Sequence, residues 1–386
     1  MEKCMVNYSQ KTTFANSFVF LNPKEVLFMT DHIKPKDDAS TYKKQTDKEN
    51  ILKLREILKE LPEFCEQYFL AMESTTSSLT RVNYARDLKI FFFFLMNEIP
   101  KFKNYSMQDF KLNDLDEISV MNLEKYLSYL TLYHGTDDIE RDNDQSGKER
   151  KLAALRSLYK YFVKRELIKT NPAALTDSPK KHEKAIIRLE PNEVVKLLDL
   201  AESGEKLTER QKKYHERTKT RDVALLTLLL GTGIRVSECV GLDIGDVNFE
   251  DYSFRVTRKG GDQVVLYFGD EVFDKLSAYY NERTKIKAFE GHENALFLSM
   301  QNKRLDVRSV QNLVKKYASV AAPLKKISPH KLRSTFGTEL YRETGDIYLV
   351  ADVLGHSDIN ITRRHYAAQS DDNRRQAMRV KLHEPD

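Results

Sequence analysis

The chain has 386 residues, which is long enough for two domains, each with a core of its own. Hydrophobic residues make up 40% of it and charged residues 31%, a composition typical of a globular protein and not of a disordered or fibrous one. The net charge of +5 is small for this length, so it does not by itself indicate a polyanionic partner. The placement of the basic residues has to decide that question.

The three cysteines, Cys4, Cys65 and Cys239, form no CxxC pair and have no histidine-rich neighbourhood. They indicate neither a disulfide framework nor a zinc site, and they fit a reducing cytoplasm. The first residues lack the long apolar core of a signal peptide, and no stretch approaches the roughly 18 apolar residues of a membrane helix. We therefore expect a cytoplasmic protein with no membrane association.

Residues 1–45 are polar and show no sustained hydrophobic period, which predicts a flexible N-terminal arm. From Thr46 onward, apolar residues recur at three- and four-residue spacing, as they do on one face of a helix. Pro62 is expected to end or kink this helix. Two further helices are predicted at residues 80–100 and 120–130.

No β-period appears before Thr170, so residues 46–169 are expected to form a small helical bundle. Its last helix carries an apolar stripe between Leu152 and Phe162, while basic residues fall largely on the other faces. A solvated surface and a contact with DNA phosphates both explain such a basic face. The candidate DNA-binding residues are Lys148, Arg150, Lys151 and Arg156.

Residues 170–188 contain two X-Pro turns and few apolar residues, which is typical of a linker between packed units. The second domain, residues 189–386, begins with a predicted helix at Glu190-Pro191. A charged stretch at residues 205–221 follows, with nothing to bury. An apolar helix is predicted next at residues 222–230, ending at the glycines of Gly231-Thr232-Gly233.

Residues 252–257 and 264–268 are rich in β-branched and aromatic side chains and predict a hairpin with a basic tip, Arg258-Lys259. The remaining predicted elements are helices at residues 307–318, 329–344, 347–354 and 374–380. The fold class is therefore mainly α: a helical bundle followed by a mixed α/β domain with a small antiparallel sheet.

Four runs of residues in this second domain resemble the tyrosine recombinase (phage integrase) family in their order, spacing and local structure. They are Thr232-Gly233-Ile234-Arg235-Val236-Ser237-Glu238, His330-Lys331-Leu332-Arg333, Leu354-Gly355-His356-Ser357 and the later Tyr366. Four ordered motifs are far more specific than one. The helical first half also resembles the core-binding domain of that family, and the chain looks most like the single-protein (XerS-like) Xer recombinases of Gram-positive bacteria.

The chemistry that the resemblance implies can be rebuilt from the residue types. Attack on a DNA phosphodiester needs a nucleophile, stabilisation of charge on the nonbridging oxygens, and a proton for the departing 5′ oxygen. A free tyrosine has a pKa of about 10, so Tyr366 needs a cationic pocket or a base to become nucleophilic. Arg235 and Arg333 can provide that pocket while they hold the phosphate, and Glu238 can orient Arg235.

The resemblance assigns the remaining roles. His330 accepts the tyrosine proton or holds the phosphate, His356 donates to a nonbridging oxygen, and Lys259 protonates the leaving 5′ hydroxyl. The product is a 3′-phosphotyrosyl bond, which keeps the energy of the broken strand, so no ATP, cofactor or metal is expected. One departure from the family is Ser334, which stands where many members have a histidine.

The resemblance also implies partners: double-stranded DNA held in a clamp of the two domains, and a homotetramer on two recombination sites. Chromosome dimer resolution and the integration or excision of a mobile element both remain open as biological roles. A type IB topoisomerase shares the pocket but relaxes single duplexes, and a catalytically silent DNA-binding protein would share the clamp. The helical first half and the Xer-like resemblance argue against the topoisomerase. The intact catalytic pocket argues against the silent binding protein.

Overall fold

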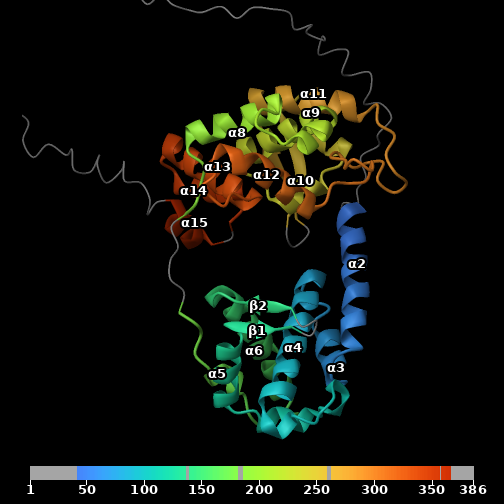
Figure 1. Ribbon diagram of the computed structural model, residues 1–386, viewed down its shortest axis with the longest axis vertical. Helices are drawn as coiled ribbons and strands as arrows, with labels where there is room; N and C mark the ends of the chain where they lie inside the picture. The colour runs from blue at the N-terminus through green and yellow to red at the C-terminus, as the bar shows by residue number, and fades with distance from the viewer. Residues whose placement is uncertain (1–40, 136–138, 181–185, 259–261, 357, 367–386) are drawn as a thin grey trace, which may run out of the picture. The chain divides into compact units, whose positions relative to one another are not determined.

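The computed structural model describes residues 41–135, 139–180, 186–258, 262–356 and 358–366 (Figure 1). Most of the predicted N-terminal arm, the tip residue Lys259 and the predicted helix at residues 374–380 lie outside these ranges. Of Tyr366, in α15, the structure describes the main chain but not the side chain. No helix in the described ranges is both long enough and apolar enough to cross a membrane.

The first group of elements is helical, as predicted. Its helices are α2 (Thr41–Leu58), α3 (Phe64–Ala71), α4 (Ser78–Glu98), α5 (Val120–Tyr129), α6 (Gln145–Val163) and α7 (Pro172–Leu175), with 3₁₀ turns η1 (Pro100–Phe102), η2 (Met107–Asp109) and η3 (Leu112–Glu117). Helix α2 begins before the predicted start at Thr46, and Pro62 lies between α2 and α3. The Ser77 side chain caps α4 by accepting a hydrogen bond from the main-chain N–H of Thr80.

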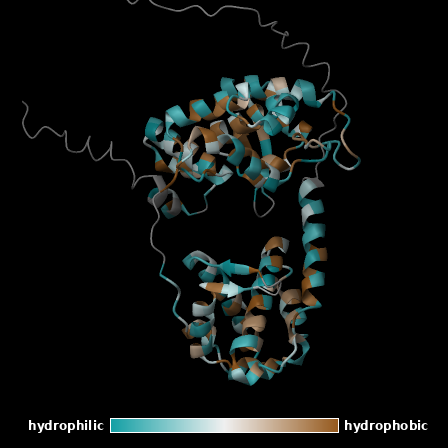
Figure 2. Cartoon of the chain, viewed as in Figure 1, coloured by the Kyte–Doolittle hydropathy of each residue, from teal (hydrophilic) through white to brown (hydrophobic). Residues whose placement is uncertain are grey.

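Aromatic side chains fill the core of this group. Phe91 and Phe92 of α4 are fully buried, and their rings lie against Tyr126 and Phe110 with centroids 5.1 and 5.0 Å apart. The run of consecutive phenylalanines is therefore largely buried, since Phe91, Phe92 and Phe94 lie in the core. Figure 2 shows hydrophobic and hydrophilic residues alternating along the helices of the chain, as amphipathic helices require.

A short antiparallel hairpin between α5 and α6 contradicts the expectation of no strand before Thr170. Its strands are β1 (Leu132–His134) and β2 (Glu140–Asp142), paired so that Tyr133 faces Arg141. Each strand has three residues, and every residue of β2 is exposed. A segment this short and this polar leaves no hydrophobic period for sequence analysis to detect.

The second group packs helices around a small sheet. Its helices are α8 (Pro191–Ser203), α9 (Glu209–Thr232), α10 (Val236–Gly241), α11 (Asp270–Arg283), α12 (Val307–Ala321), α13 (Pro329–Thr344), α14 (Ile347–Leu354) and α15 (Ile359–Tyr366), with a 3₁₀ turn η4 (Ile244–Asp246). The strands β3 (Val247–Asn248), β4 (Ser253–Thr257) and β5 (Gln263–Tyr267) form an antiparallel sheet in the order β3-β4-β5. The predicted hairpin is thus confirmed as β4 and β5.

Helix α9 begins at Glu209, so the charged stretch at residues 205–221 is largely helical and the expectation that it buries nothing is wrong. His215 and Thr218 of this stretch are buried, and so is Asp222, which follows it. The Asp222 carboxylate accepts hydrogen bonds from the Tyr317 hydroxyl at 3.0 Å and from Nη2 of Arg221 at 2.6 Å. Asp222 is buried because its neighbours satisfy its carboxylate, which a count of apolar residues does not reveal.

The buried residues form separate hydrophobic clusters. One runs from Leu54 to Ala173, and another runs from Leu189 to Leu332. A small third cluster, around Val350 and Leu354, packs α14 against α13. In Figure 1, α13, α14 and α15 lie together at one end of the second group of helices, and these helices position the candidate site.

Candidate active site and its family

The glycine at the end of α9 sets the direction of the chain into the site. Gly233 caps α9 with a φ of +61°, the left-handed conformation that glycine adopts without strain. A Cβ at this position would lie 2.4 Å from Cδ1 of Phe336 and 2.9 Å from Cδ2 of Leu354. Both the backbone conformation and the close approach of α13 and α14 therefore require glycine just before Arg235.

Arg235 is held by a buried carboxylate, as expected from its spacing to Glu238. Its Nη1 donates to Oε1 of Glu238 at 2.9 Å, and its main-chain N–H donates to Oε2 at 3.0 Å. The Glu238 side chain is 5% exposed, whereas that of Arg235 is 35% exposed. The buried Glu238 carboxylate therefore holds the Arg235 guanidinium in place, while the Arg235 side chain remains partly exposed to solvent.

Arg333 is buried on α13, and its guanidinium lies at the same turn as that of Arg235, the turn that ends α14. Its Nη1 donates to the carbonyl of Gly233 at 2.5 Å, and its Nη2 donates to the carbonyl of Leu354. Nη2 of Arg235 donates to the next carbonyl, that of Gly355, at 2.8 Å. The last carbonyls of a helix have no partner within it and carry partial negative charge. The C-terminal end of α14 therefore brings the two guanidinium groups together.

His356 follows this turn directly. Its Nδ1 lies 2.7 Å from the hydroxyl oxygen of Thr362, a fully buried residue of α15. Its main-chain N–H donates to the carbonyl of Ala351 at 2.9 Å. The imidazole is therefore oriented by α15 and its backbone by α14, beside the carbonyls that hold the arginines.

The other predicted site residues are placed less completely. His330 is an exposed residue in the first turn of α13, one turn before Arg333, and the Ser334 hydroxyl donates to its carbonyl at 3.1 Å. Tyr366 is the last residue of α15, so the same short helix carries Thr362 and the predicted nucleophile. Lys259 lies outside the described residues. The structure therefore gathers Arg235, Arg333 and His356 at one turn.

A third arginine, Arg258, lies at this turn; the sequence places it beside Lys259 in the basic tip of the hairpin. Nη2 of Arg258, at the end of β4, donates to the carbonyl of Val353 at 3.3 Å. An arginine at a hairpin tip is ordinarily solvated, so the sequence offered only its position next to Lys259 as a signal.

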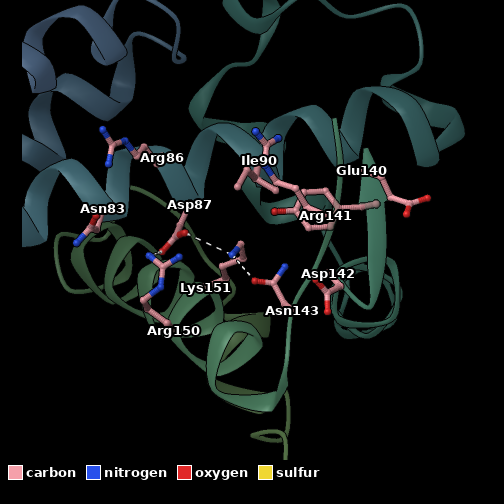
Figure 3. Close-up of a pocket in the computed structure, with 11 residues that line it drawn as sticks. Asn83, Arg86, Asp87, Ile90, Glu140, Arg141, Asp142, Asn143, Arg150 and Lys151 are labelled. Carbon is pink, nitrogen blue, oxygen red and sulfur yellow. Dashed lines mark hydrogen bonds and ion pairs between the residues drawn. The ribbon is translucent and has the colours of Figure 1, made fainter. Parts of the chain in front are cut away.

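The candidate DNA-binding residues of α6 make contacts within the protein. Lys151 is only 4% exposed, so it does not belong to an exposed basic face as its position on α6 suggested. Its Nζ donates to Oδ1 of Asn143 at 2.9 Å and lies 3.9 Å from Oδ1 of Asp87 (Figure 3). Nη1 of Arg150 donates to Oδ2 of Asp87 at 2.5 Å. The buried carboxylate of Asp87 on α4 therefore organises both cations.

Figure 3 shows these side chains lining a pocket together with Arg86 of α4 and Arg141 of β2. Burial raises the pKa of Asp87 to about 6, although Arg150 and Lys151 both act to lower it. Burial also lowers the pKa of Lys151. Desolvation of this cluster therefore outweighs the attraction between its charges.

The other two candidates on α6 also have partners. Nζ of Lys148 donates to the hydroxyl of Thr131 at 2.7 Å. Arg156 donates to the carbonyl of Ala173 at 3.0 Å and to that of Thr176 at 2.6 Å, so it ties α6 to the segment around α7. These contacts give each residue a structural role.

Comparison with known proteins decides the family. Residues 188–373 match the phage integrase family. The tyrosine recombinase XerC of Caldanaerobacter subterraneus subsp. tengcongensis is 33% identical over 308 residues, which cover 77% of this chain and 79% of the relative. The tyrosine recombinase XerD of Staphylococcus epidermidis is 30% identical over 302 residues, which cover 77% of this chain and 91% of the relative. The chain belongs to the tyrosine recombinase family.

Solved structures of tyrosine recombinases share the fold of this recombinase. XerH bound to its palindromic difH substrate, in a post-cleavage complex, has a TM-score of 0.61 at 19% identity, over 79% of this chain and 80% of that one. The integrase of transposon Tn1549 in complex with a circular intermediate DNA has a TM-score of 0.57 at 19% identity, over 81% of this chain and 98% of that one. The predicted fold class is therefore confirmed, and the chain is an enzyme of the tyrosine recombinase type.

Proposed function

We propose that this recombinase cleaves double-stranded DNA at a specific site through Tyr366 and rejoins it through a 3′-phosphotyrosyl intermediate. The observation that carries the proposal is the anchoring of Arg333 and Arg235 on the successive carbonyls of Leu354 and Gly355, next to His356. Two guanidinium groups and an imidazole held at one turn form a site for a single phosphate group.

Charge stabilisation is the main contribution of the arginines. The phosphorane that forms during attack carries more charge on its nonbridging oxygens than the phosphate at rest. Arg333 is buried and Arg235 is fixed by Glu238, so neither has to reorganise as that charge develops. Their charge also favours the phenolate form of a nearby tyrosine.

The bond changes follow from the assigned roles. The phenolic oxygen of Tyr366 bonds to phosphorus while its proton passes to His330, and the bond from phosphorus to the 5′ oxygen breaks. Lys259 supplies the proton that the 5′ oxygen takes up, and His356 donates a hydrogen bond to a nonbridging oxygen. Attack by the 5′ hydroxyl of a second strand reverses these steps. The phosphodiester energy is kept in the tyrosyl ester, so the reaction needs no ATP.

Domain roles follow the same proposal. The core-binding domain was expected at residues 46–169; we extend it to residues 41–175, because α2 begins at Thr41 and Ala173 of α7 belongs to its core. Residues 189–386 form the catalytic domain with its C-terminal tail, residues 1–40 an arm and residues 176–188 the linker, where an arm at 1–45 and a linker at 170–188 were expected. The two separate hydrophobic clusters, Leu54 to Ala173 and Leu189 to Leu332, support a division into two cores. The two domains close as a clamp on double-stranded DNA, and four subunits act together on two recombination sites.

Chromosome dimer resolution is the biological role that we propose. Support comes from the relatives named XerC and XerD, which match over three quarters of the chain. The likeness to a transposon integrase favours the alternative, integration or excision of a mobile element. Sequencing of DNA trapped covalently on the protein in cells separates the two roles. A single chromosomal locus supports the first, and sites at the ends of an element support the second.

A nicked suicide substrate tests the chemistry, because the nick lets the 5′ product diffuse away and traps the covalent complex. We expect Arg235→Ala and Arg333→Ala to lower the cleavage rate far more than they lower DNA affinity. Arg342→Ala is a matched control, since Arg342 is an exposed arginine on the same helix as Arg333. Equal losses of rate and affinity would indicate a plain binding role for the pocket.

Two rival functions give different results in simple assays. Retention of DNA in a gel shift without any covalent product would identify a catalytically silent DNA-binding protein. Relaxation of supercoiled plasmids that lack a recombination site, without strand exchange, would identify a type IB topoisomerase. A recombinase exchanges strands only between plasmids that carry its sites.

A further inference from the structure

Three arginines from three different elements donate to one turn. They are Arg258 at the end of β4, Arg333 on α13 and Arg235 at the start of α10. Their acceptors are, in the same order, the consecutive carbonyls of Val353, Leu354 and Gly355. The proposed function uses two of these arginines. The third, Arg258, has the same kind of anchor and no role so far.

Arg258 lies unusually close to the backbone of this turn. A Cβ built on Gly355 would be 2.3 Å from both Cζ and Nη1 of Arg258 and 2.8 Å from its Nε. The guanidinium therefore occupies the space that any larger residue would fill. Gly355 also has a φ of +59°, so its backbone conformation favours glycine, and a larger residue would in addition displace the Arg258 guanidinium.

The charge of Arg258 is not balanced by a carboxylate in the described part of the chain, and its Nε is buried without a hydrogen-bond partner there. Burying an unpaired donor is costly, and a neutral side chain would avoid that cost. Arg258 therefore contributes little to the stability of the fold. This points to a role in the function of the turn that it contacts.

The main chain of Arg258 is fixed as well. Its N–H donates to the carbonyl of Asp262 at 2.8 Å, which continues the pairing of β4 with β5. The side chain then joins the end of β4 to the turn that precedes His356. A hairpin and a helix end that are far apart in sequence are thereby held in one arrangement.

We propose that Arg258 is a positioning residue of the active site. It packs on Gly355 and holds the turn of residues 353–356, and so sets the position of His356 and of the carbonyl that anchors Arg235. This inference deepens the proposed function and rests on it. Its predicted signature is a loss of cleavage rate with little loss of DNA affinity.

The experiment uses the full chain and a nicked suicide substrate under single-turnover conditions, with affinity from gel shifts and folding from thermal melts. Arg258→Ala is expected to cleave at least about tenfold more slowly at unchanged affinity. Arg258→Lys is expected to recover part of the rate, because its ammonium can still donate to the Val353 carbonyl. Arg255→Ala is the matched control, since Arg255 lies on the same strand and pairs loosely with Asp246 at 3.7 Å.

A double-mutant cycle tests the contact itself. Gly355→Ala should cost more cleavage rate in the wild-type background than in Arg258→Ala, because its methyl group meets the guanidinium only when Arg258 is present. A wild-type rate for Arg258→Ala, a parallel loss of affinity, or additive effects in the cycle would overturn the inference. If Arg258→Ala melts early, the partial recovery by Arg258→Lys and the cycle measured on melting temperature still decide it. Absence of any covalent product from the wild type would instead overturn the proposed function.

Discussion

The buried carboxylate of Asp87 leads to a prediction about how the stability of the protein changes with pH. The sign of that change distinguishes the effect of burial from that of ion pairing. Its side chain is 1% exposed, and Arg150 and Lys151 both lie close to it. An ordinary ion pair would lower the pKa of the carboxyl group and make the protein more stable as pH rises. Burial acts in the opposite direction, and here it raises the pKa from 3.8 to about 6.

The linkage between proton binding and folding gives the magnitude. A carboxyl group whose pKa is raised on folding contributes stability that is fully present below the pKa of the unfolded chain. That contribution is lost as pH rises through the pKa of the folded state. The window for Asp87 therefore runs from about pH 4 to about pH 6. The difference between 3.8 and about 6 corresponds to about 3 kcal/mol of unfolding free energy.

Asp87→Asn isolates this contribution, because the amide does not titrate and its oxygen still accepts a hydrogen bond from Arg150. Urea unfolding of both proteins across this window gives the difference between their unfolding free energies. We expect the wild type to lose about 3 kcal/mol relative to Asp87→Asn between about pH 3 and pH 7.

Asp142→Asn serves as the control for this comparison. Asp142 is exposed and lines the same pocket, so its substitution removes the same charge without touching a buried pair. Its difference from the wild type should stay flat over the window. A flat difference for Asp87→Asn, or a wild type that gains stability with pH, would refute the reasoning that burial outweighs pairing.

Three further predictions concern the candidate active site. Glu238→Gln should slow cleavage about tenfold or more at unchanged DNA affinity, because the charge that orients Arg235 is lost; a wild-type rate in the suicide assay would contradict this. Gly233→Ala should lower the melting temperature and cleavage, since its Cβ would meet Phe336 at 2.4 Å, whereas Gly269→Ala, with nothing within 4 Å, should change neither. Cleavage should survive EDTA, because the proposed residues act without a metal; a strict Mg²⁺ requirement would contradict that assignment.

Much of the site could be predicted because its residues sit where local geometry is strict. Gly233 and Gly355 both have positive φ, so the turns beside Arg235 and His356 leave a signature in the sequence. His330 and Arg333 share one turn of a helix that runs over the predicted residues, Pro329–Thr344. Each of these features depends on neighbours in sequence, which is the information a single sequence carries.

What the sequence did not reveal depends on partners far along the chain. Lys151 has the spacing of a surface lysine on α6, yet Asp87 on α4 and Asn143 draw it inward. Asp222 directly follows the charged stretch and is buried because the Tyr317 hydroxyl satisfies its carboxylate. Arg258 belongs to the site only through the turn after α14. Contacts between distant elements are set by the fold, so periodicity and spacing do not report them.

The most direct test of the account is the nucleophile. Wild-type protein incubated with a nicked suicide substrate is expected to yield a covalent complex that survives denaturation. Tyr366→Phe should bind the same DNA with nearly normal affinity and yield none, because only the hydroxyl is lost. Tyr348→Phe, which changes an exposed tyrosine of α14, should behave like the wild type. Covalent product from Tyr366→Phe would place the nucleophile elsewhere and contradict the account.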